Sequence, residues 1–166
     1  MIQVYTGCGK GKTTAALGLA LRAAGAGLSV YICQFLKCGE YSESKALKKF
    51  KNIKVKCFGR KCFIRKALSK ADFELANKGL KAAKEAMLKE FDLIILDEIN
   101  VALHLNLLKL EDVLKLIKIL PENTELVLTG RDAHPKILQI ADLVSEIKED
   151  KHYYKKGIKA RKGIEY

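Results

Sequence analysis

The chain has 166 residues, of which 49% are apolar, and it carries a formal net charge of +12. This length suits a domain with its own buried core, and the sequence contains no run of about 18 apolar residues that could span a membrane. Its N-terminus enters an apolar strand pattern without the features of a signal peptide. We therefore expect one domain over residues 1–166, located in the cytoplasm.

The first third of the chain alternates strand and helix patterns. Residues 2–6 form an apolar strand pattern, and residues 12–25 follow as a helical pattern. Residues 28–35 and 53–58 are again runs of strand length, and we expect a short helix between them at residues 44–50.

The middle of the chain continues this alternation. Ser69 begins a long helix that runs to about residue 90, with Asp72 as the acid of a capping box. Residues 91–98 are typical of a buried strand, and residues 110–120 of a helix.

The last predicted elements are a buried strand at residues 124–130 and a helix at residues 134–141, with Pro135 in its first turn. The tail, residues 142–166, alternates like edge strands and turns. The whole pattern predicts an α/β fold with a mostly parallel sheet and helices on both faces.

The segment VYTGCGKGKTT, residues 4–14, joins the first strand to the first helix. Gly11, Lys12 and Thr13 match the phosphate-loop template G-x-x-x-x-G-K-[ST], but Thr6 stands where the first glycine is expected. Glycines let N–H groups converge on an anion, Lys12 adds charge, and the Thr13 hydroxyl can ligate a nucleotide's magnesium. The expected nucleotide-binding residues are Thr6, Gly7, Cys8, Gly9, Lys10, Gly11, Lys12, Thr13 and Thr14. The alternative is a Gly-rich turn that only links two elements.

Two acids end the strand pattern LIILDE. Asp97 and Glu98 should stand at the carboxyl edge of a strand beside the phosphate loop, where open α/β sheets bind ligands. One of them would hold magnesium, directly or through water. A strand-ending aspartate that caps the next segment is the competing interpretation.

Other polar residues add less to the predicted site. Arg131 ends a strand at the same edge, and its planar guanidinium suits a phosphate. His104, His134 and His152 lie far apart, and we find no Ser-His-Asp or Cys-His arrangement. The nucleophile of a reaction at this site therefore need not belong to the protein.

Residues 45–70 carry eleven Lys or Arg residues and no acid. Such a stretch attracts anions, and both nucleic acid and a polyanionic small molecule are candidates. We favour the small molecule over nucleic acid. The aromatics available there to stack on bases are few, namely Phe50, Phe58 and Phe63.

Five cysteines in a chain without an export signal indicate reduced thiols. Cys33 and Cys38, like Cys57 and Cys62, are separated by four residues, whereas zinc pairs are usually separated by two. We therefore do not expect the cysteines to bind a metal ion, and we predict Cys33 to be a small buried side chain.

Five segments spread over nearly the whole chain share one pattern: YTGCGKGKTTAALGLALRAAG, VYICQFLKCGE, LIILDEIN, LTGRDAHPKILQIADLVSEI and KHYYKKGIKARKGIEY. Together they resemble the phosphate-loop type of ATP:corrinoid adenosyltransferase, the family that makes adenosylcobalamin. In that family a threonine takes the place of the first glycine, so Thr6 fits the family's own pattern.

The resemblance implies a RecA-like phosphate-loop fold, a homodimer, ATP with Mg²⁺ as adenosyl donor, and a Co(I) corrinoid kept reduced by an electron-donating reductase. It implies that ATP lies reversed in the loop, with the ribose C5′ toward cobalt. Lys12, Thr13 and Glu98 would then be catalytic, and Thr13 and Glu98 would bind magnesium. Phe63 would contact the corrinoid. Arg131 is an expected substrate contact from its own chemistry, since its planar guanidinium suits either a phosphate or a corrinoid side chain.

The chain departs from the family pattern at three places. It begins at its first strand, without the N-terminal extension that covers the site in some members. Phe63 stands alone where some relatives carry two aromatics against the corrinoid, and Arg161 takes the place of a glutamine. The corrinoid pocket is therefore less well defined by the sequence than the ATP site.

Two other functions share the phosphate loop. A RecA-like ATPase acting on nucleic acid would use the basic stretch, although that stretch equally suits a phosphate-bearing cofactor. A small kinase would need several arginines over the transferred phosphate, and the five arginines of this chain are scattered. The C-terminal third of the chain favours the adenosyltransferase. We therefore expect neither a membrane nor nucleic acid among its partners.

Overall fold

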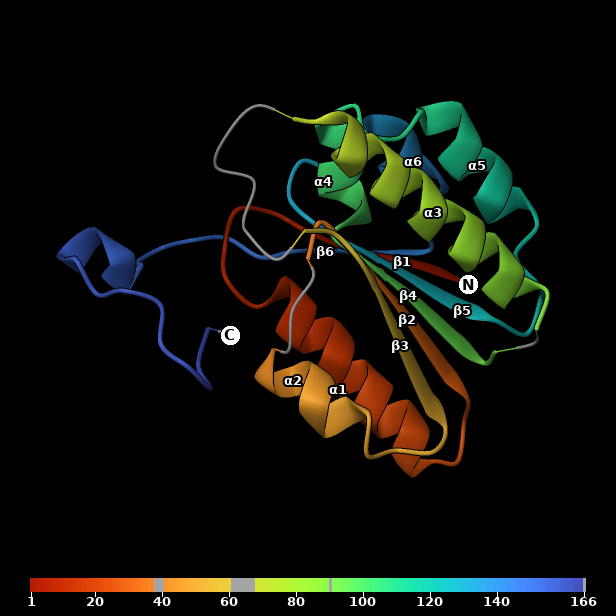
Figure 1. The fold of residues 1–166 in the computed structure, drawn as a ribbon, viewed down its shortest axis with the longest axis horizontal. Coiled ribbons are helices and arrows are strands. Elements are labelled where there is room, and N and C mark those ends of the chain that lie inside the picture. Colours follow the sequence, from red (N-terminus) through yellow and green to blue (C-terminus); the bar gives the residue numbers. More distant parts are fainter. Residues whose placement is uncertain (38–40, 61–67, 90, 166) are drawn as a thin grey trace.

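The computed structural model describes residues 1–37, 41–60, 68–89 and 91–165. Six strands form one sheet in which all neighbours are parallel, in the order β3-β2-β4-β5-β1-β6 (Figure 1). The strands are β1 (Ile2–Thr6), β2 (Val30–Phe35), β3 (Ile53–Phe58), β4 (Leu93–Asp97), β5 (Glu125–Thr129) and β6 (Leu143–Glu146).

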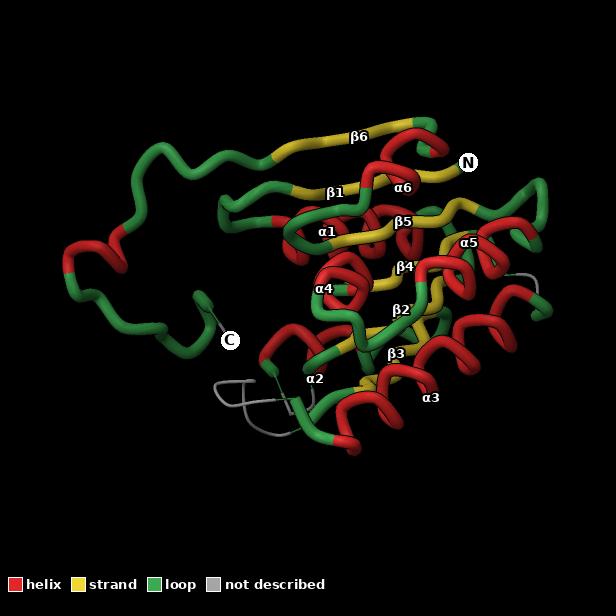
Figure 2. The backbone as a smooth tube through the Cα atoms, turned by 90° about the horizontal axis from the view of Figure 1, so that it is seen from above, coloured by secondary structure: helices red, strands yellow, loops and turns green. Residues whose placement is uncertain are grey.

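Helices cover both faces of this sheet. The helices are α1 (Lys12–Gly25), α2 (Ser42–Leu47), α3 (Lys70–Met87), α4 (Ile99–His104), α5 (Leu110–Lys118), α6 (Pro135–Ile140) and the short 3₁₀ helix η1 (Tyr153–Lys156). Figure 1 shows α1 and α2 on one face and α3 to α6 on the other. Residues 147–165, here called the C-terminal arm, leave the end of β6 and extend away from the sheet (Figure 2).

The apolar side chains form a separate core on each face. Alternate residues of a strand point to opposite faces, so Ile94 and Leu96 join the core beneath α3 to α6, while Leu93 and Ile95 join the core beneath α1 and α2. All four are buried, which explains why this strand is a continuous apolar run in the sequence.

Most predicted elements are confirmed, including the capping box of α3, in which the N–H of Ser69 donates to Asp72 at 2.8 Å. The short helix predicted at residues 44–50 lies at Ser42–Leu47, so its predicted bounds were too late in the chain. The strand predicted at residues 28–35 was predicted to begin two residues too early. The sequence pattern also missed α4, a helix of 6 residues that starts directly after β4. The sheet is wholly rather than mostly parallel.

Asp97 lies at the carboxyl edge of its strand beside the phosphate loop, as predicted, although β4 is not the sheet neighbour of β1. The loop follows β1, Asp97 ends β4, and β5 lies between these two strands. All strands are parallel, so their carboxyl ends still share one edge of the sheet. The side chains that follow β1, β2, β4 and β5 can therefore meet there.

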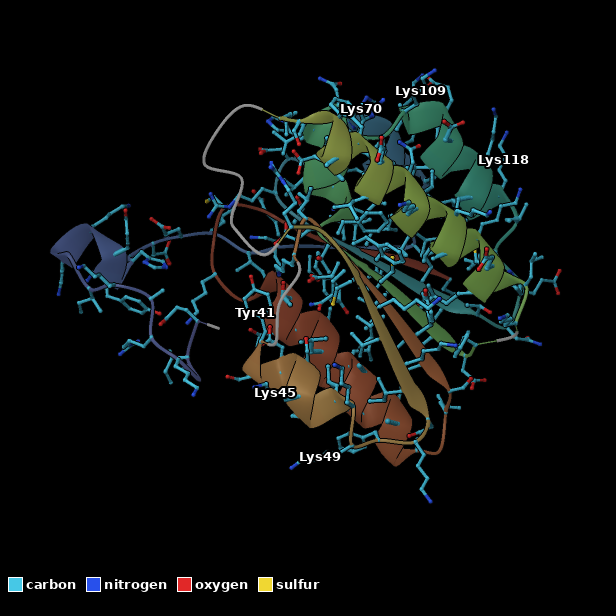
Figure 3. All side chains as sticks on the ribbon, viewed as in Figure 1. Tyr41, Lys45, Lys49, Lys70, Lys109 and Lys118 are labelled. Atoms are coloured by element: carbon cyan, nitrogen blue, oxygen red, sulfur yellow. The ribbon has the colours of Figure 1, made fainter. Side chains whose placement is uncertain are left out.

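The acid-free basic stretch divides between the two faces of the sheet. Lys45 and Lys49 lie at α2, whereas Lys70 lies at the start of α3 on the opposite face (Figure 3). The described part of the stretch is therefore not one continuous basic track. Among the described helices, none is long and apolar enough to cross a membrane.

Candidate nucleotide-binding site

Two glycines of the phosphate loop lie against the chain that follows β6. Gly7 has φ +95°, and a Cβ on it would lie 2.5 Å from the carbonyl oxygen of Ile147. A Cβ on Gly9 would lie 2.6 Å from the carbonyl oxygen of Lys148, and the N–H of Gly9 donates to Ile147 at 2.7 Å. The glycines therefore allow a close backbone contact that holds the loop in shape.

Lys12 begins α1, and its side chain folds back over the loop. Its ammonium donates to the carbonyl oxygens of Gly7 and Gly9, both at 2.7 Å. Burial, together with the positive charge of Arg131, lowers the pKa of Lys12. A positive charge thus sits at the centre of the loop, where the phosphates are expected.

Asp97 is the centre of a buried polar network. Its Oδ1 accepts hydrogen bonds from the hydroxyls of Thr13 at 2.8 Å and Thr129 at 2.6 Å. Its Oδ2 accepts from the amide of Gln34 at 3.2 Å and the ammonium of Lys37 at 3.1 Å. The fully buried carboxylate therefore joins α1 to the ends of β2 and β5.

Lys37 also contacts the other two oxygen-bearing side chains of this edge. Its ammonium lies 3.1 Å from the hydroxyl of Thr13 and 3.5 Å from the carboxylate of Glu98. Burial alone would lower the pKa of Lys37, but the charges of Asp97 and Glu98 outweigh it, and the net shift is upward. Lys37 is therefore held as an ammonium between these groups.

Left-handed backbone marks the turns that leave three strands. Leu36 follows β2 with φ 60°, Glu98 follows β4 with φ 64°, and Asp132 comes shortly after β5 with φ 54°. Such a conformation costs roughly 1–2 kcal/mol for a residue other than glycine. The strand ends at the site therefore store strain, which is common where a structure holds functional groups in place.

A cavity of about 1090 Å³ opens at this edge. One side is formed by the phosphate loop and α1, a second by the strand ends, and a third by the C-terminal arm. The loop and α1 contribute Cys8, Lys12, Thr13 and Thr14, the strand ends contribute Lys37, Glu98 and Arg131, and the arm contributes Glu149, His152, Gly163, Ile164 and Glu165. Glu43 of α2 also lines the cavity. This volume is slightly above the range usual for small-molecule sites, which is about 300–1,000 Å³.

The part of the arm beyond Lys148 is attached to the loop through Lys10. Its ammonium donates to the Tyr153 hydroxyl at 2.9 Å, to Glu165 at 3.1 Å and to the Ile164 carbonyl at 3.3 Å. Glu165 also accepts from Tyr153 and, at 2.6 Å, from the N–H of Arg161. Lys10 was predicted to bind the triphosphate, and in the structure its charge is directed to the arm.

The structure brings Lys12, Thr13, Glu98 and Arg131 to one cavity, as the sequence predicted. Within the loop, Cys8, Gly9, Lys10, Gly11 and Thr14 also line it. Thr6 and Gly7 lie behind the loop: the hydroxyl of Thr6 accepts from the N–H of Ala133 at 3.4 Å, and Gly7 faces Ile147. Their expected contacts with nucleotide remain predictions.

Phe63, Cys38 and Cys62 lie outside the described residues. Cys33 is fully buried as predicted, and burial raises the pKa of its thiol. His152 lines the cavity, and its ring nitrogen accepts from the N–H of Tyr154 at 3.0 Å.

Sequence reasoning missed two features of the site. Lys37 is the first basic residue after β2, but nothing in the local pattern indicates that it reaches Asp97. Asn100 is fully buried, and both polar atoms of its amide lack a hydrogen-bond partner among the described residues. Such a group is rare in a folded protein.

Comparison with known proteins decides the family. The family model "ATP:corrinoid adenosyltransferase BtuR/CobO/CobP" matches residues 1–166. The chain belongs to this adenosyltransferase family. The corrinoid adenosyltransferase CobA of Salmonella typhimurium is 34% identical over 170 residues, covering 100% of this chain and 85% of its own length.

One further relative and one solved structure define the limits of the likeness. A protein of Nostoc sp. PCC 7120 is 33% identical over 180 residues. The match covers 99% of this chain but only 48% of that longer protein. A KaiC-like protein of Pyrococcus horikoshii has a TM-score of 0.59 at 18% identity, covering 91% of this chain and 74% of its own. The last comparison supports the RecA-like phosphate-loop fold.

Proposed function

We propose that this adenosyltransferase transfers the 5′-deoxyadenosyl group of Mg-ATP to the Co(I) of a corrinoid. The cobalt electron pair forms the bond to C5′, and the C5′–O bond breaks so that its electrons leave with inorganic triphosphate. The observation that carries the proposal is one cavity in which a phosphate loop, a buried cation-holding network and the C-terminal arm meet.

The oxygen atoms beside Lys12 suit a magnesium ion. Mg²⁺ prefers hard oxygen ligands, and the hydroxyl of Thr13 and the carboxylate of Glu98 already face one cation, the ammonium of Lys37. We propose Thr13 and Glu98 as the metal ligands, with Asp97 orienting Thr13. When bound, Mg²⁺ stabilises negative charge on the leaving phosphates.

The protein's own part in this reaction is to position the substrates and to stabilise charge. Lys12 and the loop N–H groups lie where negative charge grows on the leaving triphosphate. Holding C5′ in line with the attacking substrate removes an entropic barrier of about 7–11 kcal/mol when the geometry is good. Neither role requires a nucleophile from the protein.

The products distinguish this function from a RecA-like ATPase or a kinase. The protein is incubated with Mg-ATP and a corrinoid kept at Co(I), and the phosphates are separated by ion exchange. We expect triphosphate to accumulate in step with the light-sensitive cobalt–carbon product. ADP and phosphate, produced without corrinoid and stimulated by single-stranded nucleic acid, would overturn the proposal.

We further propose that Phe63 forms part of the corrinoid pocket. A hydrophobic wall that displaces the lower cobalt ligand aids reduction of Co(II) and matters little for attack by Co(I). Phe63→Ala should therefore reduce the rate more from a Co(II) start than from a chemically reduced Co(I) start. Equal losses from both starting states would remove Phe63 from this role.

The partners and location follow from the family and are part of the proposal. We propose a homodimer, an electron-donating reductase and a cytoplasmic location. The edge strand β6 supports pairing of two copies, because Leu143 is 43% and Val144 47% exposed and an edge strand presents unpaired backbone groups. Sedimentation of the purified protein gives the number of subunits directly.

A further inference from the structure

Lys37 occupies an unusual place for a basic residue. Its ammonium donates to the hydroxyl oxygen of Thr13, and that hydroxyl in turn donates its proton to Asp97. Lys37 donates to one of the two lone pairs of the Thr13 hydroxyl oxygen, so a metal ion bound to Thr13 would have to use the other, directly beside the ammonium. Glu98, the second proposed ligand, faces the same ammonium at 3.5 Å.

The backbone directs Lys37 into this place. β2 ends at Phe35, and Leu36 then adopts φ 60° while its N–H donates to the carbonyl of Phe58 at 3.0 Å. This turn brings the next residue back toward the carboxyl edge of the sheet. The side chain of Lys37 is 20% exposed, so its ammonium is part of the site wall.

An ammonium and a divalent cation that contact the same hydroxyl and the same carboxylate repel each other. We propose that Lys37 is a positioning residue that competes with Mg²⁺ for Thr13 and Glu98, and so makes metal binding depend on nucleotide. Without phosphates, Mg²⁺ has to displace an existing positive charge. With a triphosphate in the loop, added negative charge stabilises both cations, and Glu43 in the same cavity offers the displaced ammonium a carboxylate.

This inference rests on the proposed function only in taking Mg²⁺ as the ion that accompanies the nucleotide. Its first test measures Mn²⁺ binding to the nucleotide-free protein by electron paramagnetic resonance of free Mn²⁺, with Lys37→Met against the original chain. We expect Mn²⁺ to bind Lys37→Met about tenfold more tightly, a factor within the usual range for coupling between two ligands. Equal Mn²⁺ affinities would overturn the proposal.

Two control variants distinguish competition between Lys37 and the metal ion at Thr13 and Glu98 from an effect of the protein's overall charge. Lys54→Met removes an exposed lysine of β3 and should leave Mn²⁺ affinity unchanged. Lys37→Arg keeps the positive charge and should bind Mn²⁺ as weakly as the original chain. If Lys54→Met raised the affinity as much as Lys37→Met, only net charge would matter and the proposal would fail.

A second test restores the missing ammonium with a small amine. In Lys37→Ala, methylammonium should raise the midpoint of thermal unfolding and weaken Mn²⁺ binding, whereas tetramethylammonium at equal ionic strength should do neither because it has no N–H donor. Identical effects of the two ions would overturn the proposal. Neither test involves a corrinoid. A failure of the proposed adenosyl transfer would therefore not change the expected Mn²⁺ affinities, and the two proposals can fail independently.

Discussion

The two walls of the cavity are built in different ways. At the sheet edge, Asp97 is fully buried and accepts hydrogen bonds from four side chains that come from three separate segments of the chain. In the C-terminal arm, the residues are mostly exposed, and Lys10 makes three of the hydrogen bonds that join the arm to the loop. The phosphate side of the site is therefore preorganised, whereas the position of the arm beyond Lys148 depends on a few exposed polar contacts.

The largest expected effect lies at the preorganised wall. Lys12→Ala removes the charge at the centre of the loop, and Thr13→Ala removes a proposed metal ligand. Each should reduce the adenosylation rate by about 10²–10³-fold, as is usual when a preorganised donor is lost. The rate is measured from the absorbance change of the corrinoid, and thermal unfolding shows whether the fold remains.

Lys54→Met serves again as the control, because this lysine is exposed on β3. It should retain the full rate. A near-normal rate with Lys12→Ala would show that the loop does not hold the leaving phosphates.

Two glycine substitutions compare the walls by stability. Gly9→Ala places a Cβ 2.6 Å from the carbonyl oxygen of Lys148 and should lower the free energy of unfolding by about 3 kcal/mol. Gly157 in the arm has φ +77° but open space around it, so Gly157→Ala should cost at most about 1 kcal/mol from backbone strain. Urea denaturation measures both, and equal losses would contradict the difference between the walls.

The sequence predicted the parts of this design that are local. The phosphate loop is contiguous, so Lys12 and Thr13 could be assigned from one segment. The capping box at Ser69 and Asp72 was predicted for the same reason. In contrast, α4 has 6 residues and no separate start signal, because its first residue follows Glu98 directly.

The part of the site that the sequence did not predict consists of contacts between residues far apart in the chain. The network around Asp97 joins Thr13, Gln34, Lys37 and Thr129, and it forms only because β2, β4 and β5 are neighbours in the sheet. Strand order is not a property of any single segment. The role of Lys37 also depends on the left-handed turn at Leu36, and leucine does not signal such a turn.

Substituting Asn100 measures how much the unpaired buried amide beside the preorganised wall lowers the free energy of unfolding. Both polar atoms of its buried amide lack a partner among the described residues, so Asn100→Leu should raise the free energy of unfolding by about 1–2 kcal/mol. Asn52 is the matched control, since its amide donates to Ala24 at 3.0 Å and to Leu28 at 2.8 Å. Asn52→Leu should therefore destabilise, and a loss of stability in both variants would show that the Asn100 amide is satisfied in solution.

The smallest expected effect concerns the arm and its pH dependence. Hydrogen bonds from Tyr153 and Arg161, with a further one from Lys10, hold the pKa of Glu165 well below its ordinary value of 4.5. A carboxyl whose pKa is lowered by folding stabilises the folded arm above its ordinary pKa, and this contribution is lost only as the pH falls through the lowered value.

The N–H of Arg161 donates to Glu165, so its NMR signal reports this contact. We expect the Arg161 signal to stay constant from pH 7 to pH 4.5 and to shift only in stronger acid. Glu165→Gln should move it at every pH while leaving the midpoint of thermal unfolding unchanged, and Glu122→Gln, at an exposed acid far along the chain, should change neither. An Arg161 signal that titrates with an ordinary carboxyl midpoint near 4.5 would mean that Tyr153, Arg161 and Lys10 do not hold Glu165 as an ionised carboxylate, and that the contact of Glu165 with Lys10 of the loop is weak.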